Sequence, residues 1–546
     1  MNPDAGQSMR AHRSRGQPSD EAAAPPSGSI PERLAALWNA AMRLEPGDAL
    51  PEIVPLPTDD RRFRDPAWRE QPFHSLALQS YVLQAEYLND LAARTALPPE
   101  EQRLLRFLVR QYVDALAPSN FPATNPEVMA RALATDGASL RAGAGNLLAD
   151  LRRGRISMSD PSAFEVGKNL AVTPGRVVFR NDLIELIQYA PTTPSVYSRP
   201  LVIVPACINK YYVLDLQPGD SFVRHAVAQG FATFVVSWRN IPPELAHLRW
   251  DDYLEQGVFA AFDVAREVSG SRSLNALGYC VGGTILASAL AVLAARRDPA
   301  VASATFLTTM LDFADPGEIG VYVSDSLLAA REPALLAGQR MRGAELAAAF
   351  SSLRANELVW GYVVGNYLMG RTPPPFDLLH WNGDATNLPG PMFAYYLREM
   401  YVRNRLRVPG ALTMSGAPVD LSRIRVPTYV LAAREDHIVP WRSAWRTTRL
   451  LGDPATFVLS ASGHIAGVIN PPESRKRNYW TSDRSAGDAD AWLDGARSVD
   501  GSWWPHWAAW LARHAGRRRK APSHPGSARH PPLDAAPGRY VREPTT

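Results

Sequence analysis

Residues 274–285 of the 546-residue chain read LNALGYCVGGTI, and this stretch decides the fold. A short apolar run ends at Tyr279, Cys280 stands between Gly278 and Gly282, and apolar residues at helical spacing come next. The pattern Gly-x-Cys-x-Gly between a strand and a helix is typical of a nucleophile elbow, whose glycines permit a strained turn and close helix–strand packing. Cys280 is therefore expected at the positive end of the following helix, a position that favours a thiolate.

Short runs of Val, Ile, Leu and Phe alternate with helical stretches on both sides of this elbow. Buried strands that alternate with helices indicate a mostly parallel sheet in an α/β protein. The first two runs could form an antiparallel hairpin at the edge of the sheet. The runs outside the elbow are RVVFRN (176–181), IELIQYA (184–190), PLVIVPA (200–206), TFVVSW (233–238), SATFLTT (303–309), PTYVLAA (427–433) and TFVLSAS (456–462).

A nucleophile at such an elbow needs an acid after a later strand and a histidine after the last one. Asp436 follows the run 427–433, and His464 follows the run 456–462. Taken singly, Cys280 could be a buried structural cysteine, Asp436 a loop cap and His464 a packed histidine. The order nucleophile, acid, histidine on these elements matches an α/β-hydrolase and predicts a catalytic triad.

The base could also be His437, which adjoins Asp436. A neighbour in an extended loop directs its side chain away from its predecessor's, so we expect His464 to be the base.

The oxyanion hole of this architecture combines two backbone N–H groups. One belongs to the residue after the nucleophile and the other to the loop after an earlier strand. Val281 is thus a candidate donor, and Cys207, or Ala206 before it, is the second. The Cys207 side chain has no elbow around it and is expected to be a small buried filler.

The chain divides into segments of different character. Residues 1–29 are predicted to be a disordered tail rich in Pro, Ser, Ala and Gly, and 30–170 a helical N-terminal domain. Residues 171–515 form the predicted catalytic domain, in which about 311–422 is a helical, aromatic-rich insertion typical of a lid or cap. Residues 516–546, rich in Arg and Pro, are expected to be a flexible C-terminal tail.

Composition excludes several classes of function. Lys and Arg number 58 and Asp and Glu 54, and a net charge of +4 over this length does not indicate nucleic acid. Two cysteines exclude a disulfide scaffold and a cysteine-rich metal site. The N-terminus has no apolar signal region, and the longest uncharged run, 277–295, opens with a Gly-rich turn. No transmembrane segment is expected, and the cytoplasm is the predicted compartment.

From about residue 60 onward the chain resembles the class I polyhydroxyalkanoate synthases. One departure stands at Ala206, where the family often has proline. The resembling segments include FEVGKNLAVTPGRVVF (164–179), PACINKYYVLDLQPGDSFVRHAVAQGF (205–231), GYCVGGTI (278–285), FDLLHWNGDATNLPGPMF (376–393), REDHIVPW (434–441), GHIAGVINPP (463–472) and GSWWPHW (501–507).

The resemblance implies an α/β-hydrolase domain after a helical N-terminal domain, with the triad on Cys280, His464 and Asp436. It implies polymerisation of 3-hydroxyacyl-CoA, with 3-hydroxybutyryl-CoA the expected substrate, into a polyester with release of CoA. The CoA thioester is substrate, and neither a cofactor nor a metal is expected. Further implied partners are a second copy of the chain in an active homodimer, the surface of the polyester granule, and phasin-type granule proteins.

Two alternatives remain open from the residues. A thioesterase or polyester depolymerase would use the same triad but admit water. A non-catalytic granule-coat protein would use the Trp-rich segment 501–511 and the helical N-terminus to bind the polymer. Outside the triad, Asp312 is expected to be a structural cap, and Arg239 and Lys210 to be solvated surface charges.

Overall fold

The computed structural model describes residues 28–160, 162–482 and 487–544, which form two compact units. Among the described residues, the first unit comprises 28–94 and 116–130, and the second comprises 95–115 and the rest from 131 to 544. The division falls inside the region that the sequence assigned to one helical domain. The predicted disordered tail lies outside the described residues, except for Gly28 and Ser29.

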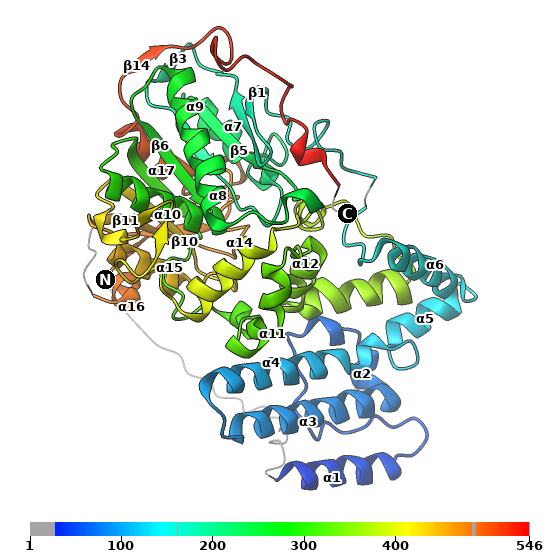
Figure 1. Ribbon diagram of the computed structural model, residues 1–546. Helices are drawn as coiled ribbons and strands as arrows, with labels where there is room; N and C mark the ends of the chain where they lie inside the picture. Colours follow the sequence, from blue (N-terminus) through cyan, green and yellow to red (C-terminus); the bar gives the residue numbers. More distant parts are fainter. Residues whose placement is uncertain (1–27, 161, 483–486, 545–546) are drawn as a thin grey trace, which may run out of the picture. The chain divides into compact units, whose positions relative to one another are not determined.

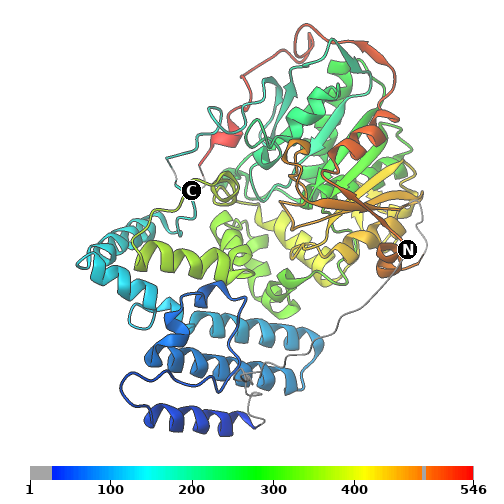
Figure 2. The same ribbon diagram turned by 180° about the vertical axis from the view of Figure 1, so that it is seen from behind.

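A ten-stranded sheet forms the centre of the second unit, with helices on both of its faces (Figures 1 and 2). The strand order is β1-β2-β5-β4-β6-β7-β10-β11-β12-β13. The strands from β5 to β11 run parallel, and antiparallel pairs close both edges. The bounds are β1 Gly175–Arg180, β2 Ile184–Tyr189, β4 Leu201–Val204, β5 Thr233–Trp238, β6 Leu274–Tyr279, β7 Val301–Leu307, β10 Thr428–Ala433, β11 Ala455–Ser460, β12 Asn478–Thr481 and β13 Arg497–Asp500.

This topology is the predicted α/β arrangement, including the antiparallel β1–β2 hairpin at one edge. Two small sheets pair β3 (Ser195–Tyr197) with β14 (Arg518–Lys520) and β8 (Thr413–Met414) with β9 (Ala417–Pro418). The helices next to the large sheet are α7 Phe222–Ala228, α8 Trp250–Asp252, α9 Ala260–Ser269, α10 Val281–Arg296, α15 Trp441–Leu450, α16 Ala489–Asp494 and α17 Trp504–Ala512.

Helix α10 explains the long uncharged run of the sequence. The end of β6 and most of α10 are buried inside the sheet domain, so the helix is apolar on nearly every side. No helix in the described ranges has the length and apolarity to cross a membrane.

The tryptophans of α17 belong to the core. Trp503, Trp504 and Trp507 are at most 1% exposed and pack around Phe222 of α7. The indole N–H groups of Trp503 and Trp504 donate to the carbonyls of Gly467 and Val468, each at 2.9 Å. The Trp-rich segment therefore packs inside the protein and supports the loop that follows β11. It does not form the exposed polymer-binding surface that a granule-coat protein would need.

Replacing Trp503 with alanine should lower the free energy of unfolding by about 3–5 kcal/mol, because it empties a fully buried site and removes a hydrogen bond. Urea denaturation followed by circular dichroism measures the loss. Trp38→Ala is the control, since Trp38 is 50% exposed and should cost less than about 1 kcal/mol. Equal losses in the two variants would contradict a core role for Trp503.

Between β7 and β10 the chain forms a helical insertion (Figure 1). The helices α4 Pro99–Ala115 and α6 Ala138–Arg153 precede the sheet in sequence but pack against this insertion. Gly143 of α6 lies so close to the Tyr367 carbonyl that a Cβ would come within 1.9 Å of its oxygen. The insertion comprises η6 Glu318–Tyr322, α11 Asp325–Leu336, α12 Gly343–Ser352, η7 Asn356–Trp360, η8 Val363–Leu368, α13 Asp377–Asn382, α14 Gly390–Tyr395 and η9 Tyr396–Val402.

The first unit is helical and has small cores of its own. One core gathers Phe63, Trp68 and Leu78. Two aromatic side chains of this unit, Trp38 and Phe73, are exposed, whereas Tyr81 is half-buried and packs against Phe63. Its helices are α1 Ile30–Met42, α2 Ala67–Glu70, α3 Pro72–Arg94 and the start of α5 Pro126–Ala134.

The C-terminal segment differs from the expected flexible tail. It runs along the free edge of β1, where the backbone groups of Val177 pair with those of Leu533 and Asp534. The buried carboxylate of Glu185 accepts the N–H groups of Arg539 and Tyr540 at 2.9 and 3.0 Å. These bonds cover an edge strand that would otherwise be open to pairing with another chain.

Candidate active site

The nucleophile elbow forms where the sequence places it. Strand β6 ends at Tyr279, helix α10 begins at Val281, and Cys280 between them has φ +53° and ψ −128°. A non-glycine residue with positive φ is strained and persists only when its surroundings hold it. The Cys280 N–H donates to the Leu307 carbonyl at 3.0 Å, and the Gly283 N–H donates to the Cys280 carbonyl at 2.9 Å. These two bonds fix the turn.

Three glycines around Cys280 leave no room for a side chain. A Cβ on Gly278 would lie 2.4 Å from the Gly283 Cα, and one on Gly283 would lie 2.0 Å from the Thr309 hydroxyl. A Cβ on Gly282 would lie 2.3 Å from the Val204 carbonyl oxygen. The last contact brings the loop after β4 against the start of α10.

Asp436 and His464 form a buried pair. His464 Nδ1 lies 2.7 Å from Asp436 Oδ2, and the side chains are 6% and 0% exposed. The other carboxylate oxygen of Asp436 accepts the N–H groups of Ile438 and Val439 at 2.9 and 2.8 Å. Because Nδ1 donates to the carboxylate, the Nε2 of His464 is left as the nitrogen that can exchange a proton.

Cys280 completes this arrangement. Burial alone would lower the pKa of His464, but the Asp436 carboxylate and the nearby Cys280 sulfur raise it well above its usual value. The ring of Tyr279, next to the nucleophile, lies 5.7 Å from the His464 ring. The structure therefore brings together the three residues that the sequence singled out.

His437 lies outside this arrangement. Its Nδ1 is buried and has no hydrogen-bond partner within the described ranges. Burial and the nearby Arg354 guanidinium lower the pKa of the imidazole. His437 therefore makes no hydrogen bond to Asp436, whose oxygens are taken by His464 and the backbone.

The two candidate oxyanion donors lie on facing loops. Val281 is the first residue of α10, and Cys207 lies in the loop after β4 that packs against Gly282. Neither N–H has an acceptor in the part of the chain that the structure describes. The Trp238 indole donates to the Pro205 carbonyl at 2.9 Å and holds the second loop in place. The Cys207 thiol is 2% exposed, and burial raises its pKa, as a small inert filler requires.

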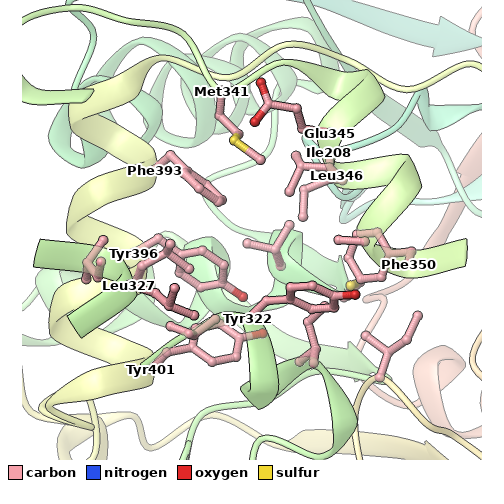
Figure 3. A pocket seen from close by; sticks show the side chains of 18 of the residues that line it. Ile208, Tyr322, Leu327, Met341, Glu345, Leu346, Phe350, Phe393, Tyr396 and Tyr401 are labelled. Atoms are coloured by element: carbon pink, nitrogen blue, oxygen red, sulfur yellow. The ribbon is translucent and has the colours of Figure 1, made fainter. Parts of the chain in front are cut away.

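A cavity of about 470 Å³ opens beside Cys280. Figure 3 shows Ile208, Met341, Leu346 and Phe393 around one part of it, and Leu327, Tyr396 and Tyr401 around another. Most of these residues come from the helical insertion, and no local pattern in the sequence identifies them as cavity-lining residues. An ion pair at 2.7 Å joins Arg331 and Glu345, both of which line the cavity. The rest of the lining is mainly aliphatic or aromatic, which suits an acyl chain.

Three charged residues outside the site have structural partners. Asp312 accepts the Asn404 amide at 2.8 Å and the Ala314 N–H at 3.0 Å, so it is the expected cap. Arg239 forms an ion pair with Glu543 at 3.3 Å. Lys210 was expected to be solvated, and this prediction is wrong. It is 2% exposed, and its ammonium donates to the Tyr540 and Glu543 carbonyls at 3.2 and 2.7 Å.

Two family models match the chain. One, described as the N-terminus of poly-beta-hydroxybutyrate polymerase (PhaC), covers residues 59–226, and one for the alpha/beta hydrolase fold covers residues 199–471. A solved hydrolase from Pseudomonas aeruginosa PA01 matches 55% of this chain and 94% of its own with 17% identity and a TM-score of 0.35, too low to carry an argument.

Curated relatives match over most of their length. The poly(3-hydroxyalkanoate) polymerase subunit PhaC of Cupriavidus necator is 53% identical over 491 residues, which cover 89% of this chain and 83% of that protein. The corresponding subunit of Rhizobium meliloti is 40% identical over 511 residues, which cover 93% and 83%. These matches confirm the resemblance seen in the sequence. The chain belongs to the PhaC family of poly(3-hydroxyalkanoate) polymerases, which are acyltransferases.

Proposed function

We propose that this polymerase converts short-chain (R)-3-hydroxyacyl-CoA, above all 3-hydroxybutyryl-CoA, into polyester through an acyl group carried on Cys280. The observation that carries the proposal is the buried His464–Asp436 pair next to Cys280. Cys280 has a strained backbone and lines an apolar cavity. The choice of a four-carbon unit is supported by the matching family model, whose description names poly-beta-hydroxybutyrate polymerase.

Acylation uses the triad in the order that its geometry suggests. His464 Nε2 takes the proton of the Cys280 thiol, while Asp436 holds the imidazole through Nδ1. The thiolate attacks the thioester carbonyl, and the negative oxygen that develops is stabilised by the N–H groups of Val281 and Cys207. The bond to the CoA sulfur then breaks, and the departing thiolate takes the proton from His464.

Chain extension reverses the proton's path. The 3-hydroxyl of the next unit gives its proton to His464, and its oxygen attacks the carbonyl held on Cys280. An ester bond forms, and the bond to the Cys280 sulfur breaks. We assign the base to His464 because the oxygens of Asp436 already accept three hydrogen bonds, two from the backbone and one from the imidazole.

The apolar cavity supports polymerisation over hydrolysis. Exchange of an acyl group between two thiols is nearly balanced in energy, so the intermediate survives only where water is excluded. The aliphatic and aromatic lining beside Cys280 provides such an environment. A thioesterase or depolymerase would need a path for water at the same point.

The function is tested with the purified protein and 3-hydroxybutyryl-CoA, by following CoA release and turbidity together. Polymerisation predicts that both signals rise in parallel. Stoichiometric release of free 3-hydroxybutyrate without turbidity would show a thioesterase instead and would overturn the proposal.

We also propose that the enzyme works as a homodimer at the granule surface, where phasin-type proteins are further candidate partners. Binding to the granule is supported by the apolar product and by two exposed aromatic residues of the first unit, Trp38 and Phe73, which are 50% and 57% exposed. Aromatic side chains in such positions suit an apolar surface.

The double variant Trp38→Ser, Phe73→Ser should reduce the share of enzyme that sediments with polyester granules by about half or more, because each change removes an apolar contact. The initial rate of CoA release should stay within about twofold of the wild type, since neither residue belongs to the triad. The matched control is Val408→Ser, an exposed apolar residue of the second unit. Equal sedimentation of the double variant and the wild type would count against a granule-binding role for these residues.

A further inference from the structure

Helix α4 lies outside the hydrolase fold in sequence, yet one of its faces packs against the cap insertion. Four residues on this face, at spacings of three and four, contact the insertion: Phe107, Arg110, Gln111 and Asp114. The Arg110 guanidinium donates to both carboxylate oxygens of Glu318 at 3.1 and 3.0 Å.

Two further bonds join the same face to a second part of the insertion. The Gln111 amide donates to the Ser352 carbonyl at 2.9 Å, and the Asn356 amide donates to Asp114 at 2.7 Å. The helix therefore spans two separate segments, η6 on one side and the end of α12 with η7 on the other. A hydrogen bond between the Tyr322 and Ser352 hydroxyls ties the two segments to each other.

Phe107 lies directly behind the cavity. It is 7% exposed and packs with Ile319 and Leu353, and its ring centre is 5.5 Å from that of Tyr322. Phe350 and Tyr401 also pack against this small cluster. Ile319, Tyr322, Phe350 and Tyr401 all line the cavity beside Cys280.

Another part of the cavity lining has little freedom to move. It includes Cys280, Val281 and Thr284, which belong to the elbow and to the buried helix α10. The size of the cavity therefore depends on the position of the insertion residues that line it, such as Ile319 and Tyr322. Phe107 packs against these residues on the side away from the cavity. The ion pair of Arg110 with Glu318 contributes less, because both side chains are 42% exposed.

We propose that helix α4 is the back wall of the acyl cavity, and that Phe107 limits the length of the 3-hydroxyacyl group that the enzyme accepts. Phe107 is a positioning residue that acts through Ile319 and Tyr322. This inference rests on the proposed function, because it takes the cavity beside Cys280 as the place where the acyl group is bound.

The test uses the full chain and four proteins: wild type, Phe107→Ala, Phe107→Leu and Leu108→Ala. Leu108 is the control, since it is the next residue of the same helix and is 53% exposed. Initial CoA release is measured with (R)-3-hydroxybutyryl-CoA and (R)-3-hydroxyoctanoyl-CoA, and kcat and KM are determined for each.

Phe107→Ala should raise the ratio of kcat/KM for the eight-carbon over the four-carbon substrate by about fivefold or more, chiefly through a lower KM for the longer one. Phe107→Leu should shift the ratio in the same direction by less, and Leu108→Ala should leave it unchanged. A purely structural role for Phe107 would lower both activities together without changing their ratio.

A ratio within about twofold of the wild type in both Phe107 variants would overturn the inference, as would an equal shift in Leu108→Ala. If Phe107→Ala does not fold, the ratio for Phe107→Leu decides the matter alone. Polymer formation by the wild type from 3-hydroxybutyryl-CoA is measured first, and it tests the proposed function alone. The substrate ratios of the variants then test the role of Phe107 separately.

Discussion

Cys280→Ala is expected to abolish polymer formation and to lower the initial rate of CoA release by about 10³-fold or more, because it removes the thiol that carries the acyl group in the proposed mechanism. The fold should survive, since alanine keeps the Cβ that already stands at φ +53° and loses only the sulfur, which leaves no large void. CoA release is followed with a thiol reagent, and circular dichroism checks the fold.

Cys207→Ala is the matched control for this variant, because it removes the other cysteine from a buried site close to the elbow. It should keep most of the activity. Cys280→Ser should retain little, since an alcohol is a poorer nucleophile beside the same base. An inactive Cys207→Ala together with an active Cys280→Ala would show that the elbow does not hold the nucleophile.

His464→Ala should lose nearly all CoA release, by about 10³-fold or more, because it removes the base that Asp436 orients beside Cys280. His437→Ala should lose less than about tenfold. Its ring makes no hydrogen bond within the described ranges, so the loss would come only from loop packing.

Both histidine variants are compared at matched protein concentration by initial CoA release, with the unfolding midpoint in urea as a check on structure. The two variants control for each other, because His437 is the sequence neighbour of Asp436 and His464 is the histidine that bonds to it. A folded His464→Ala protein with a near-normal rate would refute the triad as assigned here.

The elbow and the order of the three residues could be predicted because each lies within four residues of the end of a strand of the central sheet. Apolar runs mark the strands, and the parallel topology brings their carboxyl ends to one edge. Gly278 and Gly282 carried the prediction, and each occupies a position where the structure has no space for a Cβ.

Contacts between distant segments could not be predicted in this way. The helical spacing of the insertion is evident in the sequence, but the cavity draws its lining from segments that lie far apart in the chain, from Ile208 to Val439, and no local pattern pairs them. Lys210 was predicted to be a surface charge because nothing near it in the sequence accepts its hydrogen bonds. Its two acceptors are backbone carbonyls some 330 residues later. The tryptophans of α17 suggested an exposed surface, since an aromatic cluster has the same sequence whether it faces solvent or a core.

The long separation between Lys210 and its acceptors also bears on the order in which the molecule is assembled. During synthesis the β4 loop, with Cys207 on it, emerges early, while the Tyr540 and Glu543 carbonyls that accept hydrogen bonds from the buried Lys210 ammonium are made 330 and 333 residues later. Until then the ammonium must stay hydrated, because burying an unpaired charge is costly. In a nascent chain the elbow at Cys280 can therefore form before the loop after β4 reaches its final position. We expect the enzyme to become active toward thioesters only in one of the last steps of folding.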